Sequence, residues 1–330
     1  MSSTLPQAFL QRLQTILPAD LYDTCLRTFD MERPTCFRIN PLRGEEAVVR
    51  RELEQAGFDL RPISWAPAAY RVEGGQRRAL TESSAFAEGR LYIQNPSSML
   101  APLVLDPVPG ETVLDLAAAP GGKTLQMAAM MQNRGRISAV EPVKGRFFRL
   151  QANLQRHGVT MVRSYRMDGR AVGRKVPGRF DRVLLDAPCS SEARFRTADP
   201  ASWAHWSPKK VKESARKQGR LLESAFHSLK PGGRLLYCTC SFAPEENEQV
   251  VDGLLRRHGT ELRLEPVRLP VDNWIPGLTR WQGRRWDPAL ARAVRVIPDG
   301  EMDGFFLCLL RRRPAAAPDL DGGQSSAPFP

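Results

Sequence analysis

Residues 112–124 read TVLDLAAAPGGKT, and this stretch decides the fold class. Its apolar beginning, 112–117, is typical of a buried β-strand, and the glycines that follow predict a turn into a helix over 121–132. Gly121 and Gly122 let the backbone come close to a ligand, and the amino end of the helix offers free amides and a positive dipole end. The stretch therefore predicts a strand, a cofactor-binding turn and a helix.

Two common nucleotide motifs do not fit this turn. Residues 122–124 match the end of a Walker loop, but that loop requires a glycine five positions before Gly122, where the chain has Ala117. No Gly-x-Gly-x-x-Gly fingerprint follows the strand either. Glu141 ends the next strand, where an acidic side chain can accept hydrogen bonds from ribose hydroxyls, and Asp168 follows the third strand. These residues favour a ribose-containing cofactor without a pyrophosphate, and S-adenosylmethionine is a ligand of that kind.

Downstream of residue 88, apolar β-like runs alternate with helical stretches, which predicts an α/β fold with a doubly wound, mostly parallel sheet. The predicted strands are 112–117, 136–140, 161–165, 181–186 and 233–239, with a closing hairpin near 292–297 and 304–310. The predicted helices are 121–132, 144–157, 208–229 and 245–257. We expect three parts: a small N-terminal α+β module that binds RNA (1–87), the catalytic domain (88–313) and a disordered tail (314–330).

Two cysteine motifs close predicted strands: 186–190 reads DAPCS and 237–241 reads YCTCS. A carboxylate and a thiol at the carboxyl ends of neighbouring parallel strands lie where an open α/β sheet forms its active crevice. Methylation of carbon 5 of a pyrimidine needs a nucleophile that first adds to carbon 6, and a thiolate suits that step. Asp186 is placed to contact nitrogen 3 as a carboxylic acid. The spacing alone does not decide whether Cys189 or Cys240 attacks.

Several segments together resemble the Sun-type RNA (cytosine-5) methyltransferases, over nearly the whole chain from Phe9 to Arg311. The segments that carry the resemblance are 37–41, 92–99, 117–124, 186–190, 239–241 with 245–248, and 304–306. The resemblance implies a Rossmann-like S-adenosylmethionine-dependent methyltransferase fold. It also implies that Cys240 attacks the base, that Cys189 assists release, and that the RNA is ribosomal in preference to transfer RNA.

The resemblance further implies a set of cofactor contacts. They are Ala117, Ala118, Ala119, Pro120, Gly121, Gly122, Lys123, Glu141, Asp168 and Asp186, with Arg146 as an additional candidate. Two residues depart from the family pattern. Ser191 stands where a glycine usually follows Pro-Cys-Ser, and Asp299 stands where a histidine often follows Ile-Pro.

The charge balance agrees with a nucleic-acid partner, because Lys and Arg outnumber Asp and Glu by 48 to 36 and give a net charge of +12. Arg38 and Asn40 are candidates for RNA contact, with a structural role at a strand edge as the equal alternative. Aromatic and basic residues mingle over 274–292, where tryptophans either stack on single-stranded RNA or pack internally. Two rival functions remain: a DNA cytosine-5 methyltransferase, in which Cys189 attacks, and a non-catalytic RNA-binding assembly factor.

The remaining composition argues against other sites and compartments. The six cysteines show no paired zinc-type spacing, and the four histidines are scattered, so we expect no metal. No apolar run approaches about 18 residues, and the N-terminal residues lack the basic stretch and apolar core of a secretion signal. We therefore expect a cytoplasmic protein with reduced thiols and no membrane contact. We expect it to act as a monomer.

Overall fold

The structure, a computed structural model, describes residues 5–314. From residue 315 on, the tail predicted over 314–330 lies outside the described residues. Among the helices that the structure describes, none is long and apolar enough to cross a membrane.

The main sheet is mixed and follows the order β11-β14-β15-β9-β8-β5-β6-β7, with β10 also paired to β15. Its strands are β5 (Thr112–Asp115), β6 (Arg136–Val140), β7 (Val162–Tyr165), β8 (Phe180–Asp186), β9 (Leu229–Thr239), β10 (Leu262–Glu265), β11 (Trp274–Pro276), β14 (Val294–Val296) and β15 (Phe305–Arg312). The strands β5 to β9 run parallel, whereas β10, β14 and β15 add antiparallel pairs at one side. The predicted doubly wound, mostly parallel sheet is confirmed.

The strand order reverses between β5 and β8. From β5 the chain continues outward through β6 and β7, and it then returns to β8 on the other side of β5. In open α/β sheets, ligands bind at the carboxyl ends of the strands beside such a reversal. The topology therefore places the functional crevice at the ends of β5 and β8.

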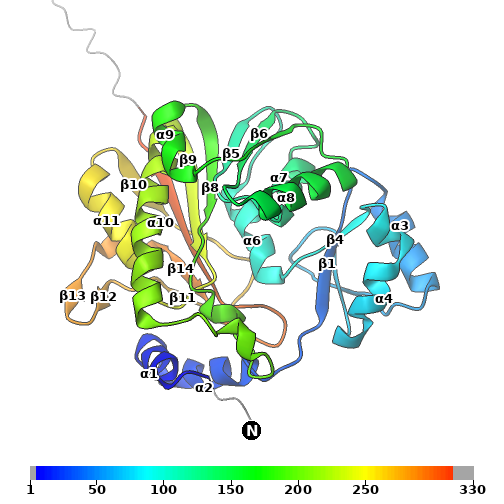
Figure 1. Cartoon of the computed structure of the whole chain (residues 1–330), viewed down its shortest axis with the longest axis horizontal. Helices are drawn as coiled ribbons and strands as arrows, with labels where there is room; N and C mark the ends of the chain where they lie inside the picture. Colours follow the sequence, from blue (N-terminus) through cyan, green and yellow to red (C-terminus); the bar gives the residue numbers. More distant parts are fainter. Residues whose placement is uncertain (1–4, 315–330) are drawn as a thin grey trace, which may run out of the picture.

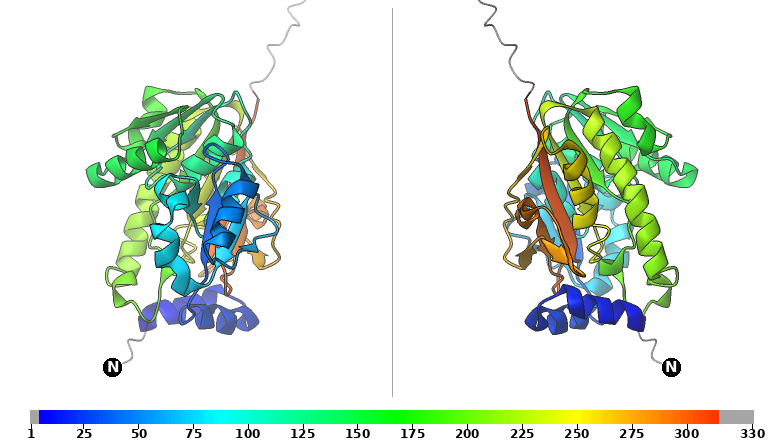
Figure 2. Two further views of the ribbon diagram at one scale, coloured as in Figure 1. Left: turned by 90° about the vertical axis from the view of Figure 1, so that its right-hand side faces the viewer. Right: turned by 90° about the vertical axis from the view of Figure 1, so that its left-hand side faces the viewer.

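Helices cover both faces of this sheet (Figure 2). The helices α6 (Pro96–Leu105), α7 (Gly122–Met130) and α8 (Lys144–Arg156) lie on one face, and α9 (Val172–Lys175), α10 (Pro208–Ser228) and α11 (Glu248–His258) lie on the other. Short 3-10 turns occur at η2 (Gly169–Ala171), η3 (Glu192–Arg194), η4 (Pro200–Ser202) and η5 (Pro288–Arg292). A two-stranded hairpin of β12 (Arg280–Trp281) and β13 (Arg284–Arg285) projects beside α11 (Figure 1).

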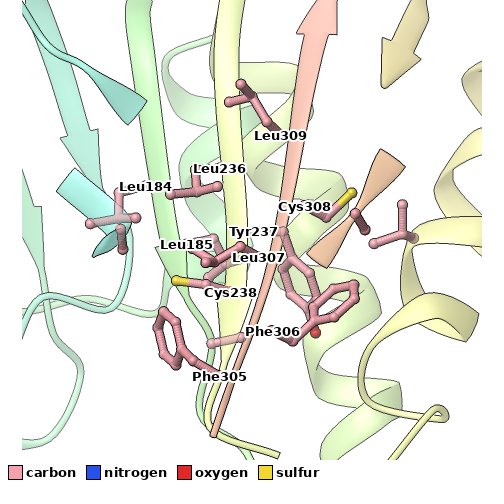
Figure 3. Close-up of a cluster of buried hydrophobic side chains, with 14 of the residues drawn as sticks. Leu184, Leu185, Leu236, Tyr237, Cys238, Phe305, Phe306, Leu307, Cys308 and Leu309 are labelled. Atoms are coloured by element: carbon pink, nitrogen blue, oxygen red, sulfur yellow. The ribbon is translucent and has the colours of Figure 1, made fainter. Parts of the chain in front are cut away.

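The centre of the sheet is almost wholly apolar (Figure 3). Leu184 of β8, Leu236 of β9 and Leu307 of β15 are inaccessible to solvent, because strands covered on both faces bury successive side chains in both directions. Tyr237 is also fully buried, and its hydroxyl donates a hydrogen bond to the backbone oxygen of Glu246. That bond joins the core to the segment that follows the second cysteine motif.

The N-terminal region divides into two parts. The strands β2 (Arg61–Pro62), β3 (Ala69–Val72), β1 (Thr35–Ile39) and β4 (Leu91–Ile93) form a small antiparallel sheet. The helices α3 (Glu46–Gln55), α4 (Arg77–Glu82) and α5 (Ser84–Ala87) join this sheet around a separate apolar core, beside the 3-10 turn η1 (Gly74–Gln76). The boundary at residue 87 stays a prediction, but β4 lies beyond it and pairs with β1, so the small sheet draws on both sides of that position.

The first two helices, α1 (Gln7–Ile16) and α2 (Ala19–Thr28), lie apart from the small sheet (Figure 1). Phe9 packs edge-on against Phe195 with 4.9 Å between the ring centroids, and it belongs to the core of the main domain. The prediction that residues 1–87 form one module therefore does not describe these helices, because their apolar face covers the catalytic domain.

The predicted strands and helices of the catalytic domain agree with the structure to within a few residues at their ends, as is usual for helix and strand boundaries. The helix α6 was not predicted. Its start does carry a signal, since Asn95 caps it by accepting a hydrogen bond from the Ser97 amide and Pro96 occupies its first turn.

Candidate active site

A cleft of about 430 Å³ opens at the carboxyl ends of β5, β8 and β9. It is lined by residues of four segments: 92–98 before and in α6, the glycine turn 117–123, the first cysteine motif 186–191 with Arg194, and Cys240. Asp115 and Arg146 complete the lining. The cleft brings the predicted cofactor turn and both predicted catalytic cysteines into one space.

The two cysteines form a close pair. The Sγ atoms of Cys189 and Cys240 lie 3.3 Å apart, and the Cys240 Sγ also lies 3.6 Å from the Ser191 hydroxyl. The hydrogen bond from Cys189, with help from the nearby Arg194 charge, lowers the pKa of Cys240 to about 6. The same hydrogen bond, together with burial, raises the pKa of Cys189 above its usual value. The two opposite pKa shifts thus favour a thiolate on Cys240 and a thiol on Cys189.

Asp186 lies in the same cleft and is paired with Lys123. The Lys123 ammonium donates to Asp186 Oδ2 at 2.6 Å and to the Ser98 hydroxyl at 2.7 Å. The Lys123 side chain therefore joins the predicted catalytic carboxylate to the start of α6.

Glu246 connects the two cysteine loops. Its carboxylate accepts hydrogen bonds from the amide and hydroxyl of Ser190, the residue after Cys189, and from the hydroxyl of Ser241, the residue after Cys240. Gln218 of α10 donates to the same carboxylate at 3.1 Å. Burial, with the nearby charge of a second carboxylate, raises the pKa of Glu246 to about 7. One buried side chain thereby fixes the separation of both loops.

That second carboxylate belongs to Glu192, which supports the Cys240 loop alone. It accepts the amides of Phe242 and Ala243, both at 2.9 Å, and the Ser241 hydroxyl at 3.1 Å. The indole of Trp206 donates to its other oxygen at 2.8 Å. Burial raises the pKa of Glu192.

The glycine turn fits a cofactor of the expected type. The backbone of Gly121 has a φ of +116°, and a Cβ at Gly122 would lie 2.8 Å from the Tyr92 ring, so both positions require glycine. Glu141 is buried at the end of β6, and its Oε2 accepts no hydrogen bond from any described residue, although Arg146 Nη1 lies 3.2 Å away. Arg146 also donates to the Ala119 carbonyl at 2.7 Å, which ties α8 to the turn. A buried carboxylate oxygen without a hydrogen bond suits a ribose hydroxyl.

Asp168 does not line this cleft. Its side chain accepts hydrogen bonds from the Arg170 amide at 2.9 Å and from the Arg170 guanidinium, and it lines a separate hollow beside α10. A carboxylate at the start of a 3-10 turn caps the free amides there, and this local contact competes with a ligand. The proposed adenine contact of Asp168 requires this cap to open.

The candidate RNA contacts at Arg38 and Asn40 are wrong. Both side chains are buried: Arg38 donates to the Gln94 side chain at 3.0 Å, and Asn40 donates to the carbonyls of Gly89 and His157 at 2.9 Å. They join the small sheet to the catalytic domain. A structural role is therefore correct, although β1 is an inner strand of the small sheet and not its edge.

The tryptophans within 274–292 differ in their exposure to solvent. Trp281 and Trp286 are buried and belong to the main core, whereas Trp274 is 39% exposed. Arg284 and Arg285 of the hairpin are exposed and make no ion pair with any described residue. The basic side chains of this segment are therefore accessible to RNA, whereas Trp281 and Trp286 are buried and cannot stack on it.

The histidines are not all scattered. His227 of α10 and His258 of α11 converge on Glu223, with His258 Nε2 at 2.5 Å and His227 Nε2 at 3.3 Å from Oε1. The other oxygen of Glu223 is held by the Arg257 guanidinium at 2.8 Å. The sequence spacing did not reveal this group because its members come from two helices.

The two departures from the family pattern have structural consequences. Ser191 has a φ of +59°, in the left-handed region that favours glycine, and its hydroxyl contacts Cys240. Asp299 accepts the amides of Glu301 and Met302 at 2.7 and 2.8 Å and so closes a turn.

Among the residues that were not predicted as site residues are Ser98 and Arg194, which line the cleft, and Glu246, which lies behind it and holds both cysteine loops. Ser98 and Glu246 lie in the segments that carried the resemblance, 92–99 and 245–248. Arg194 had no sequence signal, because it approaches Cys240 only through the turn η3 after β8.

Comparisons with known proteins agree with this geometry. The family described as 16S rRNA methyltransferase RsmB/F matches residues 102–311, and the N-terminal domain of 16S rRNA methyltransferase RsmF matches residues 5–96. A tRNA (cytosine(49)-C(5))-methyltransferase of Pyrococcus abyssi is 41% identical over 85% of this chain and 88% of its own length. The ribosomal RNA small subunit methyltransferase F of Serratia proteamaculans is 35% identical over 99% of this chain, which spans 67% of that relative. A solved methyltransferase homologue from Pyrococcus horikoshii is 33% identical, with a TM-score of 0.75 over 93% of this chain and 99% of its own.

Proposed function

The chain belongs to the RsmB/F family of S-adenosylmethionine-dependent RNA cytosine-5 methyltransferases, and from that premise we propose that Cys240 is its nucleophile and ribosomal RNA its substrate. Membership removes the two rivals, a DNA methyltransferase and a non-catalytic assembly factor. The observation that supports the choice of nucleophile is the charge of Arg194 beside Cys240. The contact between the two sulfur atoms is symmetric, and this charge helps the hydrogen bond from Cys189 to lower the pKa of Cys240.

The first step is addition of the Cys240 thiolate to carbon 6 of a cytosine. The bond from sulfur to carbon 6 forms, and the electron pair of the carbon 5–carbon 6 double bond makes carbon 5 nucleophilic. Nitrogen 3 needs a proton as negative charge develops on the ring. Asp186 supplies that contact, and the Lys123 ammonium 2.6 Å from its Oδ2 is the proton source beside it.

When S-adenosylmethionine is bound, it supplies the electrophilic methyl group that carbon 5 attacks. The residues proposed to hold it are the turn 117–123, Glu141, Asp186 and Arg146, with Asp168 once its cap opens. The buried Oε2 of Glu141 supports the ribose contact.

Release then requires loss of the proton from carbon 5. The electrons of the carbon 5–hydrogen bond restore the double bond to carbon 6, and the bond from carbon 6 to the Cys240 sulfur breaks, which regenerates the thiolate. Nitrogen 3 returns its proton to Asp186 and Lys123 in the same step. Cys189 lies 3.3 Å from that sulfur, within reach of the reacting ring. We assign it the release step: after its thiol has given its own proton to water, the Cys189 sulfur accepts the carbon 5 proton, directly or through a water molecule.

The experiment that tests these roles is adduct trapping. Purified Cys189→Ala and Cys240→Ala proteins are incubated with cellular RNA and S-adenosylmethionine, denatured, and examined for a protein–RNA adduct. We expect an adduct with Cys189→Ala and none with Cys240→Ala. The opposite pattern would reverse the roles of the cysteines. No adduct from either variant, together with no methylation by the wild type, would refute the proposal as a whole.

Ribosomal RNA is favoured by the extent of similarity. The RsmF N-terminal domain matches residues 5–96, and the RsmF relative aligns over 99% of the chain. Transfer RNA is the second candidate, because the methyltransferase from Pyrococcus abyssi has the higher identity of 41%. Bisulfite mapping of 5-methylcytosine in cells with and without the gene distinguishes them. A site lost from small-subunit ribosomal RNA supports the proposal, and a site lost only from transfer RNA overturns this choice.

A further inference from the structure

A long groove lies between α10 and α11, outside the catalytic cleft. Two hollows of about 660 and 810 Å³ meet there and share Arg216, Gly219 and Arg257. The β12–β13 hairpin borders one hollow, and η2 with α9 borders the other (Figure 1). We call this surface the α10–α11 groove.

The groove is lined by basic side chains without acidic partners. Lys212, Arg216 and Arg220 are exposed and follow one another at four-residue spacing on α10, so they form one row with a rise of about 6 Å between successive members. Arg284 of the hairpin and Arg174 of α9 face the same hollows. None of these five side chains makes an ion pair with a residue between 5 and 314.

The acidic groups of the groove are already neutralised within the protein. Glu223 is held by Arg257 and His258, and Asp168 is held by Arg170. Glu245 is paired with Arg12 at 2.6 Å. The uncompensated charge of the groove is therefore positive, and it suits an anionic partner.

Two half-buried glycines, one on each helix, line the floor of the groove. Gly219 lies in the middle of α10, and a Cβ there would meet no atom within 4 Å. Gly253 occupies the equivalent place on α11, where a Cβ would approach only the tip of Arg257 at 3.6 Å. Glycine is unfavourable in a helix interior, and here the protein's own packing does not require it. Both glycines are explained if a partner approaches the helix backbone closely, because a larger side chain would block that approach.

The groove is joined to the catalytic loops by single residues. Gln218, next to Gly219, donates to the Pro188 carbonyl at 2.9 Å, just before Cys189. Glu245, which lines the groove, precedes Glu246, which holds both cysteine loops. A partner in the groove therefore lies behind the loops that carry the chemistry.

We propose that the α10–α11 groove binds the phosphate backbone of the substrate RNA at a point away from the target cytosine. The inference rests on the proposed function in that RNA is the substrate, and it adds a second contact surface. The evenly spaced row on α10 matches a run of phosphates along one strand, and the glycine floor admits the backbone. Such contacts hold the RNA without reading its bases.

The test uses the full chain with Arg216→Gln and Arg284→Gln combined. The control combines Arg134→Gln and Arg136→Gln, two exposed arginines at the start of β6 that do not line the groove, so that the net charge changes equally. The probe is a labelled 20-base-pair RNA duplex of arbitrary sequence, titrated between 50 and 200 mM salt. We expect the groove variant to bind about tenfold more weakly and to lose about 1.5 from the slope of log affinity against log salt. We expect little change in the control.

Equal losses in the two variants, or a wild-type slope in the groove variant, would overturn the proposal. If the groove instead binds an acidic protein, the groove variant should keep the wild-type salt slope with RNA. Failure of the proposed function is seen separately, because adduct trapping in the Cys189→Ala background then fails with every RNA while duplex binding still reports on the groove.

The glycine floor is tested by Gly219→Ala. Alanine favours the helix and has room at this position, so the melting temperature should rise. If phosphates approach the floor, affinity for the duplex should fall severalfold in the same protein. A rise in melting temperature with unchanged affinity would overturn the role assigned to the floor.

Discussion

Replacing Glu246 with alanine should damage the enzyme through geometry. The change leaves the Ser190 amide and one amide proton of Gln218 without an acceptor, because the wild-type carboxylate accepts both, at 2.9 and 3.1 Å. The Ser190 and Ser241 hydroxyls lie 3.0 Å apart and can satisfy each other. Two buried donors without partners cost about 1–3 kcal/mol each, so the variant should lose about 2–6 kcal/mol of unfolding free energy.

The methylation rate of the Glu246→Ala protein should also fall, even in the fraction that remains folded. With the shared acceptor gone, the loops of Cys189 and Cys240 are free to separate from their 3.3 Å contact. A misplacement of about 1 Å in a catalytic group costs on the order of 10²-fold in rate. Single-turnover methylation, measured on protein confirmed as folded by circular dichroism, should therefore drop about 10²-fold.

Glu246→Gln is the matched control. An amide of the same shape can still accept from Ser190 or Gln218, so the variant should keep methylation within about tenfold of wild type. A folded alanine variant with the wild-type rate, or a glutamine variant as slow as alanine, would refute the argument from loop spacing.

The same control tests the ionisation of this carboxyl. Burial raises the folded pKa of Glu246 from 4.5 to about 7, so the folded protein holds the proton more tightly than the unfolded chain. The resulting stability is present at acidic pH and is lost as pH rises from about 4.5 through about 7, by roughly 3 kcal/mol at most. Glu246→Gln should flatten this part of the curve in urea unfolding.

Three further changes test other parts of the site. Arg194→Gln should move the acid limb of the methylation rate, set by the Cys240 pKa of about 6, upward by about one pH unit, so the loss is large near pH 6 and small near pH 9. Arg295→Met should cost about 3–5 kcal/mol in urea unfolding, because it leaves the fully buried Glu248 carboxylate without its guanidinium partner. Ser191→Gly should raise stability by about 1 kcal/mol through relief of the positive φ, while slowing methylation at pH 6 because the thiolate loses a hydroxyl contact. A neutral outcome in the pH profile of either site variant would contradict the thiolate assignment.

The catalytic domain was predictable because its signals are local. Strands were predicted from the apolar runs at β5, β6, β8 and β9, and a turn from the glycines after β5. Parallel topology then brings the carboxyl ends of these strands together. The close pair of Cys189 and Cys240 follows from strands β8 and β9 being neighbours.

The errors came from contacts that no local pattern encodes. Arg38 and Asn40 were predicted either to contact RNA or to have a structural role at a strand edge, but β1 is the buried centre of a small sheet packed on the catalytic domain. The amphipathic helix α1 could cover either part of the protein, and its apolar face fits the main core. Asp168 occupies the predicted position after β7, yet the nearest amide and Arg170 take its side chain in the absence of a ligand.

Three features around the thiol pair are unfavourable by local rules. Glu192 and Glu246 are carboxyls buried side by side with raised pKa values, and Ser191 holds a left-handed backbone in the loop between them. Each is unfavourable for folding taken alone, since burial disfavours charge and a side chain disfavours positive φ. Together they hold the loops of Cys189 and Cys240 from the side away from the cleft, so that both cysteines line the cleft. The unfavourable groups are therefore explained by the geometry that the reaction requires, and a core of apolar residues at these positions would be easier to fold but unable to hold the two loops at one distance.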